Sequence, residues 1–138
     1  MKRDSEALKL RTKDFALRVL KLYRCLPRTE EARILGSQLL RSSTSIGANY
    51  RAACRGRSRA EFVAKLGIVL EEADETVFWL ELFQEGNIFP AEKLRNLVQE
   101  ANELVLNFCQ LSAHREGFTS AIRPLTSAIW FQPLQSDL

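Results

Sequence analysis

The sequence predicts an all-α protein, an up-down-up-down antiparallel four-helix bundle, and three observations carry this prediction. Four long segments place apolar residues at the helical spacings of three and four, and no segment alternates apolar and polar residues as a strand does. Proline or glycine interrupts the pattern between successive segments, so the connections are short and neighbouring helices should run antiparallel. The length of 138 residues fits a single domain.

The first predicted helix spans about 12–26, has one apolar stripe and ends at Pro27, which cannot continue a helix. The second spans 29–56. Thr29 precedes its first turn, where a hydroxyl side chain can accept a hydrogen bond from a free backbone N–H. A local capping signal therefore marks its start.

The third predicted helix spans 58–86, and Ser58 with Glu61 three residues later is typical of a capping box. The fourth spans 90–115 and opens at Pro90, whose missing N–H costs nothing in a first turn. Both segments carry the apolar spacing of a bundle core.

Residues 1–116 are expected to form the bundle, and residues 117–138, which contain two prolines, are expected to form an irregular tail.

No apolar run approaches the roughly 18 residues of a membrane helix, and the charged N-terminus does not resemble a secretory signal. Three widely spaced cysteines fit reduced thiols. We therefore expect a cytoplasmic protein without membrane contact.

Charge is distributed unevenly along the chain. Residues 1–28 carry nine basic and three acidic groups, and residues 41–65 carry six basic and one acidic group. Residues 71–103 carry two basic and nine acidic groups, although the whole chain has a net charge of only +3. The molecule is therefore expected to have a basic and an acidic part, which are either solvated helix faces or binding surfaces.

The basic charge of residues 41–65 falls largely on one face of the second helix and on the turn after it, among small side chains that let a partner approach the backbone. Arginine is suited to bidentate contact with phosphate. The candidate nucleic-acid-binding residues are Arg41, Arg51, Arg55, Arg57, Arg59 and Lys65. Alternatively, these cations pair with Glu61, Glu72 and Glu75, inside the bundle or across a subunit boundary.

The C-terminal half of the third helix is apolar on nearly all sides, which is typical of a helix buried on more than one face. Either the tail or another subunit would cover the apolar side chains that the core of the bundle does not bury, and we favour oligomerisation. The candidate interface residues are Ile68, Phe78, Trp79, Leu82 and Phe83.

Recognisable catalytic and metal-binding motifs are missing from the sequence. It has no glycine-rich phosphate loop, no CxxC pair and no HExxH motif, and its single histidine is His114. The acidic run of the third helix lacks the Glu-x-x-His motifs of a di-iron bundle. We therefore expect a non-enzymatic protein without metal or cofactor.

Three stretches carry a family resemblance: QLLRSSTSIGANY (38–50), RGRSRAEF (55–62) and KLGIVLEEADETVFWLEL (65–82). They resemble the bacterial 23S rRNA-intervening sequence proteins, which are related to the accessory variability determinant protein of diversity-generating retroelements. The resemblance covers about residues 10–115. In many relatives a glutamate follows the position of Arg51, whereas this chain has Ala52.

The resemblance implies a homopentamer, a barrel of five bundles, with a basic surface that in the retroelement branch binds nucleic acid and a reverse transcriptase. It supplies no catalytic residues. The leading hypothesis is a non-enzymatic oligomeric protein that binds nucleic-acid backbone, as an accessory factor to RNA or a retroelement. The alternative is a self-associating protein-interaction scaffold that does not bind nucleic acid.

Overall fold

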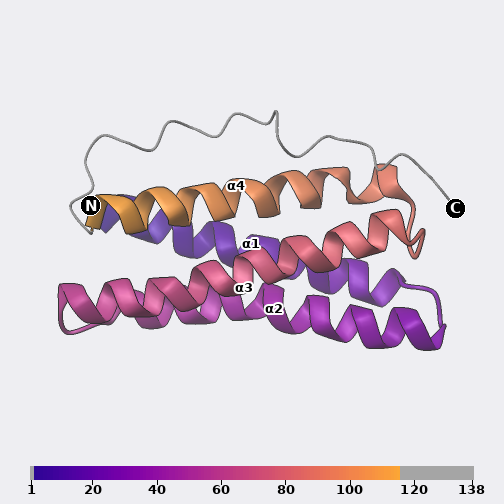
Figure 1. Ribbon diagram of the computed structural model, residues 1–138, viewed down its shortest axis with the longest axis horizontal. Coiled ribbons are helices and arrows are strands. Elements are labelled where there is room, and N and C mark those ends of the chain that lie inside the picture. The colour runs from indigo at the N-terminus through magenta and orange to yellow at the C-terminus, as the bar shows by residue number, and fades with distance from the viewer. Residues whose placement is uncertain (1, 116–138) are drawn as a thin grey trace, which may run out of the picture.

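The computed structural model describes residues 2–115, which form four α-helices and no strand. Short turns connect the helices, which lie side by side (Figure 1). The helices are α1 (Lys2–Cys25), α2 (Glu30–Cys54), α3 (Arg59–Glu85) and α4 (Ala91–Arg115). The predicted all-α class with four helices is therefore confirmed. The expected tail, 117–138, lies outside the described residues.

Both predicted N-caps are present. The Thr29 side chain accepts a hydrogen bond from the backbone N–H of Ala32 at 3.2 Å. The Ser58 hydroxyl accepts one from the backbone N–H of Glu61 at 3.1 Å, while the Glu61 carboxylate accepts from the backbone N–H of Arg57 at 2.8 Å. The second bond comes from the residue before the cap rather than from Ser58 itself, yet it closes the same turn.

The predicted start of the first helix, about residue 12, is wrong, because α1 begins at Lys2. Residues 2–11 are mostly strong helix formers, with Asp4 in the first turn, but they show little apolar periodicity. Leu10 in this segment is 67% exposed. Leu8 packs against the core, and Arg11 donates to both carboxylate oxygens of Glu100 on α4, at 2.6 and 2.9 Å.

The core lies along the inner faces of all four helices. The rings of Tyr50 on α2 and Phe108 on α4 are 5.4 Å apart between centroids and form part of it. The largest fully buried side chains are Tyr50, Phe15, Phe83, Phe108, Leu39, Ile46, Leu66, Leu80, Leu94, Leu104, Val19 and Val69. Side chains at spacings of three and four thus close the interior.

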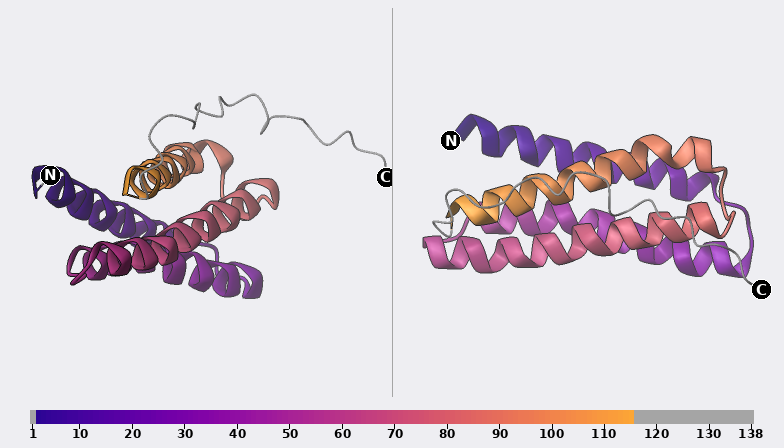
Figure 2. Two further views of the ribbon diagram at one scale, coloured as in Figure 1. Left: turned by 60° about the vertical axis from the view of Figure 1, so that its left-hand side comes forward. Right: turned by 45° about the horizontal axis from the view of Figure 1, so that its top comes forward.

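The helices do not contact one another equally. α3 packs closely on α2 and α4, and α1 packs on α2 but touches α4 least. α1 diverges from α4 towards its own N-terminus (Figure 2, right). At that end, residues from the starts of α1 and α3 and from the ends of α2 and α4 line one pocket. We call this the basic end. No helix within residues 2–115 is both long and apolar enough to span a bilayer.

Candidate nucleic-acid interface

The predicted face of α2 is a continuous exposed stripe on the side of the helix away from the core. Its members are Ser37, Arg41, Thr44, Ala48, Arg51 and Arg55, all exposed. Ser37 and Thr44 donate hydrogen bonds to the carbonyls of Ile34 and Leu40 of the same helix, at 2.7 and 2.8 Å. Because these bonds satisfy the hydroxyl groups within the helix, residues that often interrupt helices are accommodated here.

Arg41 at one edge of this stripe is paired within the subunit. Its guanidinium lies 3.3 Å from a carboxylate oxygen of Glu72 and also bonds to Glu75. The hydrogen bond from Arg41 lowers the pKa of the Glu75 carboxyl, and the bond from the Trp79 indole contributes to the lowering. Arg41 is therefore a candidate cation that pairs with acidic residues of α3 inside the bundle, as the alternative interpretation expected.

Lys65 is also paired, because its ammonium lies 2.9 Å from a carboxylate oxygen of Glu61 one turn earlier. The backbone N–H of Arg57 and then Lys65 lower the pKa of Glu61. Lys65 and Glu61 are both partly exposed, so this pair remains open to solvent and to competition from other anions.

The remaining four candidates have no such partner. Arg51, Arg55, Arg57 and Arg59 are exposed, and within residues 2–115 no carboxylate lies within ion-pair distance of them. They follow one another over the last turn of α2, the connection to α3 and the first residue of α3. We call these four residues the arginine cluster. The pKa of the Glu6 carboxyl on α1 is lowered mainly by the hydrogen bond from Lys9 and also by the charge of Arg51, so Arg51 has a nearby acid outside ion-pair distance. Four guanidinium groups without a direct ion pair at one end of the molecule attract phosphate.

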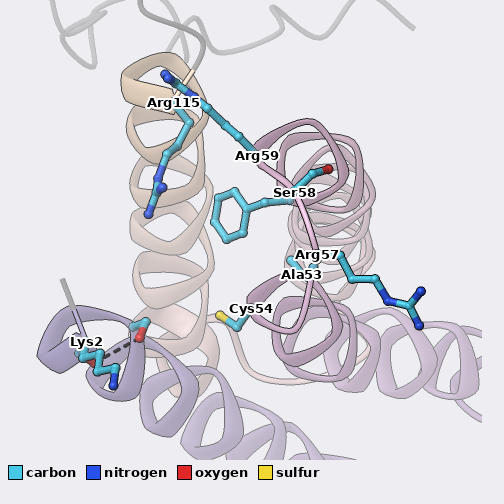
Figure 3. Close-up of a pocket in the computed structure, with 10 residues that line it drawn as sticks. Lys2, Ala53, Cys54, Arg57, Ser58, Arg59 and Arg115 are labelled. Atoms are coloured by element: carbon cyan, nitrogen blue, oxygen red, sulfur yellow. Dashed lines mark hydrogen bonds between the residues drawn. The ribbon is translucent and has the colours of Figure 1, made fainter.

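Beside the arginine cluster, the pocket at the basic end has a volume of about 400 Å³. Figure 3 shows Arg59 extending from the start of α3 towards the end of α4, whereas the side chain of Arg57 points away from both. The guanidinium of Arg115 lies 5.0 Å from the centre of the Phe62 ring. The lining residues are Lys2, Ser5, Ala53, Cys54, Gly56, Arg57, Ser58, Arg59, Phe62 and Arg115.

The candidate interface on α3 is partly exposed. Ile68 and Phe78 are 45% and 51% exposed, and Leu82 and Trp79 are half-buried. Phe78 meets Trp79 edge to face, with the ring centroids 5.0 Å apart. Phe83 must be removed from the set, because it is fully buried in the core of its own subunit.

The placement of Phe83 follows from the packing of α3. The buried positions of α3 run through Ala73, Thr76, Leu80 and Phe83 at spacings of three and four. Helical spacing predicts Ala73 and Leu80 in the core, but Phe83 lies in the run that is apolar on nearly all sides, so its side of the helix could not be told from the sequence. The Thr76 hydroxyl is satisfied by bonding to the Glu72 carbonyl at 2.8 Å.

The family of the chain is shown by its match to a family model. The model described as 23S rRNA-intervening sequence protein matches residues 6–107. This chain belongs to the 23S rRNA-intervening sequence protein family. A crystal structure of a protein of unknown function from the S23 ribosomal protein family of Bacteroides thetaiotaomicron is 34% identical to this family member, with a TM-score of 0.73. The match covers 78% of this chain and 96% of that chain. No curated protein matches.

Two features of this 23S rRNA-intervening sequence protein escaped sequence analysis. Lys2 and Arg115, 113 positions apart in the sequence, line the same pocket only because the helix ends converge. Exposed leucines also occur away from α3, including Leu10 at 67% and Leu106 at 55%. The spacing of these leucines in the sequence gave only a weak indication that they are exposed. Single exposed leucines are common on protein surfaces.

Proposed function

We propose that this protein binds nucleic-acid backbone through the arginine cluster, as a non-enzymatic accessory factor in the cytoplasm. The observation that carries the proposal is the lack of carboxylate partners around Arg51, Arg55, Arg57 and Arg59 within the described residues. Unpaired arginines can bind phosphate without first breaking an internal ion pair. The family name refers to ribosomal RNA, which makes structured RNA the first ligand to test.

The proposed functional unit is a homopentamer of up-down-up-down bundles. The exposed Ile68 and Phe78, flanked by the half-buried Leu82 and Trp79, support a subunit contact on α3. An assembly would repeat the arginine cluster several times and strengthen binding to a long polyanion without new contacts. A reverse transcriptase as a protein partner rests on the family resemblance alone.

A second candidate function is a self-associating scaffold that does not bind nucleic acid. The pairing of Arg41 with Glu72 and Glu75 favours it, because it consumes one candidate cation internally. Under this alternative, carboxylates of a neighbouring subunit would neutralise the arginine cluster in the same way.

The experiment is a binding titration of the full chain against structured RNA, single-stranded RNA and duplex DNA. The test variant is the triple substitution Arg55→Gln, Arg57→Gln and Arg59→Gln. The matched control is Arg24→Gln, Arg28→Gln and Arg95→Gln, which makes the same charge change at exposed positions near the opposite end. We expect the test variant to lose at least tenfold in affinity and the control to lose much less.

Two results decide between the candidate functions. Equal losses in the test and control variants would mean that net charge rather than the arginine cluster governs binding. A test variant that dissociates into monomers would place the cluster in a subunit interface and favour the scaffold.

A further inference from the structure

The pocket at the basic end differs from the open arginine stripe of α2 in shape. It is lined by residues from the ends of all four helices and has a volume of about 400 Å³. Pockets of roughly 300–1,000 Å³ hold small ligands, and the lower part of that range suits a single nucleotide. A duplex cannot enter a space of this size, but the end of a single strand can.

The charge lining the pocket has one sign. Lys2, Arg59 and Arg115 line it together with Ser5 and other uncharged residues, and none of the lining residues within 2–115 is acidic. The fourth lining cation, Arg57, directs its side chain away from Arg59 and Arg115 (Figure 3). Figure 3 shows the Arg59 side chain reaching the end of α4 and the Arg115 side chain pointing back along α4, so these cations surround the pocket rather than meet at one point. Their positive charge, with no carboxylate among the described lining residues, favours an anionic ligand.

The pocket also has a surface for a planar group. The Arg115 guanidinium lies 5.0 Å from the centre of the half-buried Phe62 ring. Aromatic rings and arginine planes both stack on nucleobases, and such stacking tolerates any base because every base has a π-face. Phosphate-binding cations and a stacking surface thus border one cavity.

We propose that this pocket binds a nucleoside 5′-monophosphate group, with the phosphate at Arg115 and the base against the Phe62 ring. The inference builds on the proposed function, because its natural source would be the 5′-phosphorylated end of a bound strand. A terminal monophosphate carries more negative charge than an internal phosphodiester, about −1.5 to −2 at neutral pH. The pocket therefore favours strand ends, whereas the arginine cluster holds the strand without regard to its ends.

The test compares two single-stranded RNA 12-mers of one sequence, with a 5′-phosphate or a 5′-hydroxyl, in a fluorescence binding assay. Adenosine 5′-monophosphate is a third probe and represents a free nucleotide. We expect the 5′-phosphate to raise affinity about tenfold, as befits added charge-assisted hydrogen bonds. Arg115→Gln should remove this preference, so that the two 12-mers bind with equal affinity. Arg95→Gln, at an exposed position on the same helix, is the matched control.

Cys54 provides a second readout that is independent of affinity. Its partly buried thiol lines the pocket, whereas Cys25 and Cys109 are exposed elsewhere. In a Cys25→Ser, Cys109→Ser background, the 5′-phosphorylated 12-mer should slow iodoacetamide modification of Cys54 and the 5′-hydroxyl 12-mer should not. Protection by adenosine monophosphate alone, without binding of either 12-mer, would support the pocket and overturn the proposed nucleic-acid function.

Equal affinity for the two 12-mers, with no protection of Cys54 by any probe, would overturn the pocket assignment and leave the arginine cluster as the binding site. A 5′-phosphate preference that survives Arg115→Gln would equally overturn it. Failure of this inference is therefore distinguishable from failure of the proposed function.

Discussion

The guanidinium of Arg41 on α2 lies 3.3 Å from a carboxylate oxygen of Glu72 on α3. Glu75, one turn further along α3, binds the same guanidinium. These contacts divide the basic residues of α2 into two groups. Arg41 holds two helices of one subunit together, whereas Arg51 and Arg55 on the same stripe have no carboxylate partner within the described residues. The exposed stripe is therefore one surface with two electrostatic roles.

The Arg41 pair predicts a difference between two single substitutions. Arg41→Gln should weaken nucleic-acid binding much less than Arg55→Gln, because the Arg41 charge is already neutralised by Glu72 and Glu75. The measurement is a pair of titrations with one RNA at one salt concentration. Equal losses of affinity would show that the Arg41 pair opens to contact phosphate.

The same pair predicts a pH dependence of stability. The hydrogen bond from Arg41 lowers the pKa of Glu75 below its ordinary value of 4.5. A lowered carboxyl pKa contributes stability that is present above the ordinary value and is lost as the pH falls towards the folded-state pKa. Urea unfolding between pH 6 and about 3 should show a falling free energy of unfolding, and Glu75→Gln should reduce the slope. An unchanged slope would contradict the pairing.

Tyr50 predicts the opposite behaviour at alkaline pH. Burial, followed by the neighbouring Cys54, raises the pKa of the Tyr50 hydroxyl above its ordinary value of 10.0. Because the unfolded chain ionises Tyr50 first, its contribution to stability is complete below pH 10 and decreases above it. Tyr50→Phe should flatten the loss of unfolding free energy between about pH 9.5 and 11.5.

Gly67 in the middle of α3 offers a stabilising substitution. No atom lies within 4 Å of a Cβ built at this position. Alanine should therefore raise the free energy of unfolding by about 1 kcal/mol, the helix-propensity difference between the two residues. Gly47→Ala is the control and should gain less, since its Cβ would meet the Thr12 hydroxyl at 3.3 Å. Chemical denaturation at one protein concentration measures both, and a destabilised Gly67→Ala variant would show that another subunit covers this part of α3.

The proposed assembly is tested on the exposed apolar side chains of α3. Phe78→Asp should convert the expected pentamer of 15.8 kDa chains into smaller species while circular dichroism remains helical. Leu106→Asp on α4, where the leucine is 55% exposed, is the matched control and should leave the assembly intact. Native mass spectrometry gives the subunit number directly. A wild-type protein that is monomeric at micromolar concentration would contradict the proposed pentamer.

Much of the fold could be predicted from sequence because its signals are local. Thr29 and Ser58 are capping residues that mark the start of a helix through contacts within four residues of sequence. The exposed stripe of α2 follows from helical periodicity alone. The start of α1 could not be found in this way. Residues 2–11 are held by helix propensity and by Arg11 bonding to Glu100, which lies 89 positions away.

The candidate site was only partly predictable for a related reason. Sequence reasoning gathered the cations of α2 on one face but could not decide which of them was paired, because Arg41 reaches carboxylates 31 and 34 positions away. The pocket likewise depends on Lys2 and Arg115 meeting in space. Phe83 was assigned to the surface because the end of α3 is apolar on nearly all sides, and only the packing of α3 places this side chain in the core.

The most direct test of the central claim is the salt dependence of RNA binding by the wild type and by the Arg55→Gln, Arg57→Gln, Arg59→Gln variant. Four phosphate contacts by the arginine cluster predict a slope of log K against log salt of about −3 for a single strand. One remaining contact predicts about −0.7 for the variant. A shallow wild-type slope, or a steep slope that survives the triple substitution, would contradict the claim that the arginine cluster binds the phosphate backbone.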